Sequence, residues 1–259
     1  MIKSLYNEKT LIGRLHQYFL IYFETFSVST VDTLFLLILS ILTLESAHSI
    51  RFLYQHFLSG ITKKSLNVFY YACSYAKVDY SKFMNTTARI ALKLIPDSLQ
   101  TQPVFLCVDD TMVSKFGTKR LFFSTVFPEN LQIFCAWQEK APLNQTGSDR
   151  MQYIPLFLYS FRWNIETSYY EQKTFWSFCN YIIRSCKGIE MLVSLSNITY
   201  CAMRILPYQN EHFSEYRTKS VQEFRFELSQ GIRSQIFFAT FVKNIETHIK
   251  SNAMTKTLK

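Results

Sequence analysis

The chain has 259 residues, and 28 lysines and arginines against 19 aspartates and glutamates give it a net charge of +9. Hydrophobic residues make up 48% and charged residues only 18%, which excludes intrinsic disorder, because disordered chains combine few apolar residues with many charges. The excess of positive charge favours an anionic partner. Six glycines and six prolines are few for this length, so helices should dominate.

The first hundred residues carry apolar side chains at helical spacing and predict a helical bundle. Thr30 and Asp32 are the expected N-terminal cap of the helix that ends at Leu44. The other helices are expected over Tyr6–Tyr22, Ser46–Leu58, Lys63–Tyr75 and Ser81–Ile95.

This bundle, residues 1–100, is a candidate DNA-binding region, because its lysines and arginines could contact phosphates. A basic face that is only solvated is the alternative. The cations expected on its surface are Lys63, Lys64, Lys77, Lys82, Arg89 and Lys93.

The run Thr33–Leu44 has twelve uncharged residues between Asp32 and Glu45. A membrane span needs about 20 apolar residues, so this run predicts a buried core helix. The positive charge would also suit an anionic lipid surface, so a basic, helical membrane-associated protein remains an alternative. The first ten residues lack the features of an export signal, and we expect a cytoplasmic protein, associated with the nucleoid.

The pattern changes after Pro103. Two short apolar runs, Val104–Val108 and Leu121–Phe127, predict strands, and the first ends in Asp109-Asp110-Thr111. Acids at the end of a buried strand indicate a functional site. A polar loop is expected over Ala141–Met151, followed by helices over Ile154–Asn180, Glu190–Leu206 and Gly231–Ile249.

Four polar residues, Tyr159, Arg162, Glu166 and Lys173, would share an arc of about 60° on one face of the helix that contains them. Such a face could hold phosphates with its cations and a metal ion with its carboxylate. Aromatic side chains that could stack on bases lie nearby: Trp163, Tyr169 and Tyr170. The alternative is an exposed helix with an ion pair between Arg162 and Glu166.

The segment Tyr159–Lys173, YSFRWNIETSYYEQK, fits the signature Y-x2-R-x3-E-x6-K at every defined position. In this the chain resembles DDE-type insertion-sequence transposases, from about Val104 to Lys187. The resemblance implies a ribonuclease H-like core that cuts and joins DNA with two Mg²⁺ or Mn²⁺ ions.

The resemblance also assigns residues to roles. Asp110, with Asp109 as the alternative, and Glu166 would be catalytic metal ligands. Tyr159, Arg162 and Lys173 would contact DNA at the terminal repeats of a mobile element, and Trp163 follows the family's usual arginine. A homodimer on DNA would be in keeping with this chemistry.

The family's second catalytic Asp has no counterpart on a strand, since Asp149 lies in the polar loop and Glu129 and Glu139 are weaker substitutes. We interpret the chain as internally shortened near Lys119-Arg120. The expected fold is α+β: a helical N-terminal bundle, residues 1–100, and a reduced ribonuclease H-like core with covering helices, residues 101–259. The expected function is that of a shortened transposase with low or no activity, or of a non-catalytic DNA-binding remnant that interferes with full-length copies.

Overall fold

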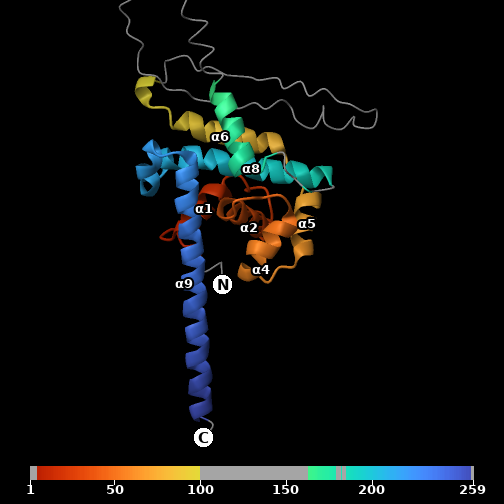
Figure 1. Cartoon of the computed structure of the whole chain (residues 1–259), viewed down its shortest axis with the longest axis vertical. Coiled ribbons are helices and arrows are strands. Elements are labelled where there is room, and N and C mark those ends of the chain that lie inside the picture. The colour runs from red at the N-terminus through yellow and green to blue at the C-terminus, as the bar shows by residue number, and fades with distance from the viewer. Residues whose placement is uncertain (1–4, 100–162, 179–181, 183–184, 258–259) are drawn as a thin grey trace, which may run out of the picture.

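The computed structural model describes residues 5–99, 163–178, 182 and 185–257, and its regular elements there are helical (Figure 1). Residues 163–175 form a helical segment, here called the signature helix. The other α-helices are α1 (Leu11–Leu20), α2 (Val28–Thr43), α3 (Ile50–Leu53), α4 (Ser59–Ile61), α5 (Leu66–Tyr75), α6 (Tyr80–Lys93), α8 (Cys186–Gln209) and α9 (Val221–Thr257). A π-helical turn, η2 (Tyr54–Leu58), and two 3-10 helices, η3 (Asp97–Leu99) and η5 (Glu211–Thr218), complete the elements.

The predicted α+β fold with a ribonuclease H-like core is wrong. No strand or sheet occurs in the part of the chain that the structure describes, and the C-terminal helices do not cover a sheet. They pack on the N-terminal helices instead, since α8 and α9 both contact α2. The physical reason is that α2 is apolar on all sides and is enclosed by helices from both ends of the chain. The predicted strands 104–108 and 121–127 lie outside the described residues.

Helix α2 is the centre of the molecule, and every residue from Asp32 to Thr43 is buried. Its neighbours are α1, α5, α8 and α9. The run predicted as a buried core helix is therefore confirmed as one. The predicted cap was wrong, because Ser27 precedes the helix and its hydroxyl accepts a hydrogen bond from the amide of Thr30.

Local capping sets where the other N-terminal helices begin. Thr10 caps α1, because its hydroxyl accepts a hydrogen bond of 2.9 Å from the amide of Gly13. Ser49 caps α3, and the carboxylate of Asp79 caps α6. The helices predicted over 6–22 and 46–58 are thus shorter at their starts, whereas that over 81–95 matches α6 closely.

Helix α8 is the one helix, among the residues described, that is long and apolar enough to cross a membrane. Its length is 24 residues, but 67% of its apolar window is buried inside the protein. The core helix of a folded body has the same properties. The helix was expected to end at Leu206, but its last turn includes Pro207 and continues to Gln209. The side chain of Arg217 donates a 2.8 Å hydrogen bond to the Pro207 carbonyl.

Helix α9 has 37 residues, which makes it about 55 Å long. Its first part packs on α1, α2 and α8, and Gly231 allows the approach to α1, because a Cβ there would lie 2.6 Å from a methyl group of Leu11. Its second part extends away from the other labelled helices and carries the C-terminus (Figure 1).

Candidate nucleic-acid interface

The signature helix has a buried face and an exposed face. Ile165, Ser168 and Gln172 are buried, at the three- and four-residue spacing of one helix side. The opposite side is solvent-exposed along its length. Its residues are Trp163, which is 71% exposed, Glu166, Tyr170, which is 64% exposed, and Lys173.

The end of the signature helix is fixed by its backbone. The amide of Phe178 donates to the carbonyl of Gln172 at 3.1 Å, so the chain after the last turn folds back onto one of the helix's final carbonyls. Ser177 has a φ of 53°, the left-handed conformation that usually selects glycine. Its hydroxyl accepts a 2.9 Å hydrogen bond from the amide of Ala47, and this joins the signature helix to the segment after α2.

Arg225 of α9 connects the ends of two helices. Its Nη2 donates to the carbonyls of Ile41 and Leu44 at 2.8 and 2.6 Å, and its Nη1 donates to the carbonyl of Phe175. These carbonyls lie at the ends of α2 and of the signature helix, where a positive charge interacts favourably with the helix dipole. Its guanidinium carbon also lies 4.5 Å from the ring centroid of Trp176.

Burial lowers the pKa of Arg225 to about 10, while the carboxylate of Glu45 opposes the shift. The guanidinium therefore remains charged at neutral pH. Trp176 is fully buried, and its Nε1 donates a 3.1 Å hydrogen bond to Thr199 of α8. The signature helix is thus held at its C-terminal end by α9 and by α8.

A second set of contacts holds the middle of the signature helix on α8. The carboxylate of Glu171 accepts hydrogen bonds from the Tyr200 hydroxyl at 2.7 Å and from the Arg204 guanidinium at 2.6 Å. Burial is the main cause that raises the pKa of Tyr200 to about 12, so the phenol stays a donor at neutral pH. Sequence reasoning missed Glu171, Arg204 and Arg225, because their partners are distant in the chain.

The structure brings Trp163, Glu166 and Lys173 of the predicted site to one exposed surface. The Nζ of Lys173 lies 4.4 Å from the ring centroid of Tyr169, a cation–π distance. The remaining predicted site residues, Asp109, Asp110, Tyr159 and Arg162, lie outside the described residues.

Of the residues expected to hold the two metal ions, Glu166 lies among those that the structure describes. Among the residues described, no group of three or more His, Cys, Asp or Glu side chains could hold a metal ion. A two-metal centre needs several carboxylates that converge, and Glu166 alone is not such a set.

Helix α6 presents a row of cations. Lys82, Arg89 and Lys93 are all exposed and lie within about 40° of one another around the helix, over about 17 Å of its length. The helix itself, YSKFMNTTARIALK, contains no Asp or Glu. Both α6 and the signature helix lie on α8, since α6 contacts α8 and Glu171 bonds to it. We use the name cationic–aromatic surface for the α6 row and the exposed face of the signature helix taken together, because both elements are held on α8.

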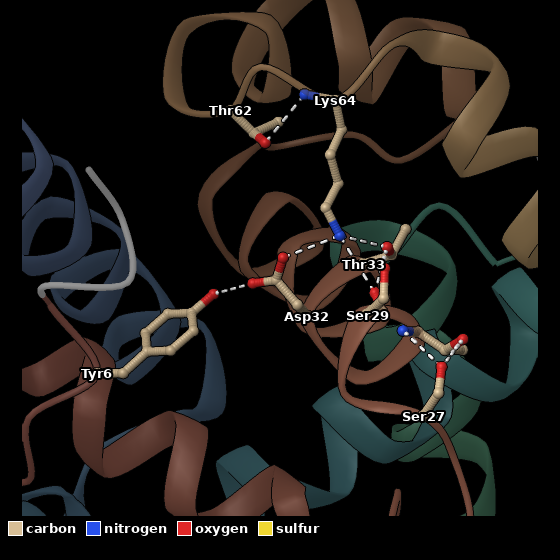
Figure 2. A network of polar contacts seen from close by, with 8 residues as sticks. Tyr6, Ser27, Ser29, Asp32, Thr33, Thr62 and Lys64 are labelled. Carbon is tan, nitrogen blue, oxygen red and sulfur yellow. Dashed lines mark hydrogen bonds and ion pairs between the residues drawn. The ribbon is translucent and has the colours of Figure 1, made fainter.

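Lys64 belongs to a polar network instead of the predicted cationic surface (Figure 2). Its Nζ lies 2.9 Å from the Asp32 carboxylate, donates to the Thr33 hydroxyl at 2.7 Å and to the Ser29 carbonyl at 3.1 Å. The Tyr6 hydroxyl donates to the other Asp32 oxygen at 2.9 Å. This network compensates the charge of Asp32 inside α2, and it ties α2 to residues before α1 and α5.

No family model matches the sequence, and neither a curated protein nor a solved structure matches it.

Proposed function

We propose that this chain is a transposase-derived DNA-binding protein that binds duplex DNA through the cationic–aromatic surface without cutting it. The observation that carries the proposal is the exposed face of the signature helix. Three of the residues that the transposase resemblance assigns to DNA or metal, Trp163, Glu166 and Lys173, lie there together.

The aromatic residues of this face support contact with nucleic acid. Trp163 and Tyr170 are mostly exposed, although large aromatic side chains are usually covered in a folded protein. Flat rings beside a lysine are suited to stacking on bases at a distorted or single-stranded DNA end, where stacking stabilises the complex by about 1–3 kcal/mol per base.

The charge of α6 supports contact with phosphates. Duplex DNA carries one negative charge per about 1.7 Å of its axis, so the α6 row, about 17 Å long, would face several phosphates. The overall charge of +9 would assist association with any DNA sequence.

The test compares two double variants with the same net charge. Arg89→Ala/Lys93→Ala removes two cations from α6, and Lys9→Ala/Lys63→Ala removes two exposed lysines that precede α1 and follow α4. Binding of a fluorescent duplex, which carries the DNA flanking the gene, is measured by anisotropy over a range of salt. We expect the first variant to reduce the slope of log K against log salt by about 1.8, and the second to leave it near the wild-type value.

The same DNA, incubated with Mg²⁺ or Mn²⁺ and run on a denaturing gel, tests the non-catalytic part of the proposal. We expect no nick. Nicks that are lost in Glu166→Gln would mean that the protein is an active transposase. Equal slopes for the two double variants would place DNA binding, if present, away from α6.

A further inference from the structure

The second part of α9, from residue 237 onward, carries an apolar stripe whose side chains remain about half or more exposed in the described part of the protomer. At about 100° per residue, its apolar side chains fall within an arc of about 140°. They are Phe237, Phe238, Phe241, Val242, Ile245 and Ile249, and between 42% and 64% of each is exposed. By contrast, Phe224, Leu228 and Ile232 in the first part of the same helix are buried in the core.

We propose that this stripe is a dimerisation surface, and that it packs antiparallel against the same stripe of a second copy of this chain. This inference is independent of the proposed DNA binding. Contiguous exposed apolar patches mark interaction sites on soluble proteins, and a stripe along a projecting helix fits a partner helix best.

The area of the stripe is sufficient for a dimer. A buried aromatic side chain covers about 150–250 Å². The three phenylalanines, exposed by 64%, 63% and 52%, therefore offer about 350 Å² per copy and about 700 Å² in a pair. Together with Val242, Ile245 and Ile249, the total reaches the roughly 1,000 Å² that a specific interface needs.

The charges at one edge of the stripe select the antiparallel orientation. This edge carries Lys243, Glu246 and Lys250, all exposed, in the order positive, negative, positive. In an antiparallel pair the same edge of both helices meets, so Glu246 of each copy faces Lys243 of the other. The crossing point then lies between residues 244 and 245, close to the middle of the stripe.

A parallel pair would instead bring this edge against the opposite one, where Asn244 lies and no acidic residue is present. A groove of about 650 Å³ lies between this part of α9 and Leu5 and Thr10, and Phe238, Val242, Lys243 and Glu246 line its α9 side. A lipid surface fits less well, since the polar side mixes Lys243 and Lys250 with Glu246 and uncharged residues, whereas the polar side of a membrane-binding helix is rich in cations.

The first experiment measures the mass of the full-length protein by sedimentation over a range of concentrations. We expect a monomer–dimer equilibrium in the wild type. Ile245→Glu, which puts a charge at the centre of the stripe, should weaken the dimer by about a hundredfold or more. Thr247→Glu adds the same charge on the polar side of the same turn and should leave dimerisation within about twofold. Circular dichroism confirms that both variants keep the wild-type helix content.

Charge reversal tests the orientation without changing the stripe. Lys243→Glu and Glu246→Lys each place like charges opposite one another, and each should weaken the dimer about fivefold. The double variant restores both pairs and should recover the wild-type dissociation constant to within about twofold. If the double variant is as weak as the two single changes combined, the antiparallel arrangement is refuted.

Sedimentation with anionic phosphatidylserine vesicles separates the dimer from a lipid surface. A wild-type protein that is monomeric at every concentration, but binds these vesicles and loses binding in Ile245→Glu, would overturn the proposal in favour of a membrane helix. A dimer that persists unchanged in Ile245→Glu would also overturn it.

Discussion

Two apolar helical regions of this protein differ in what covers them. Helix α2 is buried on all sides by α1, α5, α8 and α9. The second part of α9 has six large apolar side chains on one face, and all of them are largely exposed. The difference shows that an apolar pattern specifies a need for burial, while the chain topology decides whether the protomer itself meets that need.

The two regions also differ in how their polar groups are satisfied. At the end of α2, three side chains of α9 bind the last carbonyls: Arg225, Ser229 and Arg233. They follow one another at four-residue intervals, so they lie on one side of α9. The first part of α9 is thus fixed by polar contacts and apolar packing together, whereas the apolar side chains of the second part remain largely exposed in the described structure of one protomer.

The largest expected effect contrasts the two apolar regions directly. Leu37→Ala in α2, where the side chain is fully buried, should lower the free energy of unfolding by about 2–5 kcal/mol, because it leaves a cavity. Phe241→Ala in α9 should change it by no more than about 0.5 kcal/mol in protein dilute enough to be monomeric. Urea denaturation followed by circular dichroism measures both. Equal losses would mean that Phe241 is covered within the protomer.

The next effect concerns Arg225, which binds the carbonyls at the C-terminal end of α2. Arg225→Met should cost about 2–3 kcal/mol of unfolding free energy, because it leaves buried carbonyls without donors. Arg233→Met is the control, since Arg233 is exposed and donates to the Thr43 carbonyl at 3.0 Å; it should cost less than about 1 kcal/mol. If the two variants are equally stable in urea, the buried cap contributes little to the junction of the helices.

Substitutions at Ser177 should have a smaller effect on the free energy of unfolding. A lost hydrogen bond lowers it, and relief of backbone strain raises it. Ser177→Ala removes the acceptor for the Ala47 amide and should cost about 1–2 kcal/mol. Ser177→Gly loses the same hydrogen bond but adopts the positive φ without strain. Glycine should therefore be more stable than alanine here by about 1 kcal/mol, as measured by the midpoint of urea denaturation. The opposite ranking would contradict the left-handed conformation.

The smallest effect is a dependence of stability on pH. His16 stacks on Tyr6 with ring centroids 4.2 Å apart, and burial lowers its pKa, opposed by the nearby Asp32 carboxylate. As the pH falls, His16 therefore binds a proton in the unfolded chain before it does so in the folded protein. Protonation then favours the unfolded chain, so the protein loses stability as the pH falls below about 6.5. His16→Phe should flatten the change in stability between pH 7 and pH 5. If the stability of the variant changes with pH as steeply as that of the wild type, other titratable groups cause the pH dependence.

Local sequence patterns predicted several elements because short-range physics determines them. Helix α6 matches its expected range, and its cations are exposed, since apolar spacing and the Asp79 cap act within a few residues. That Glu166 and Lys173 share one helix face also followed from helical periodicity. The cap of α2 was misjudged, because Asp32 is satisfied by Lys64 and Tyr6, residues that no local rule connects to it.

The sequence by itself determined the helical stretches, the buried character of α2 and the excess of positive charge. Only the tertiary structure decided that the C-terminal helices enclose α2 where a ribonuclease H-like sheet was expected, and that Arg225 caps two helices at once. It also decided that the apolar side chains in the first part of α9 are buried in the core, whereas those in the second part are exposed. The physical reason is that propensity and amphipathicity are local, whereas burial depends on which distant segments meet, and a signature of fifteen residues does not fix those contacts.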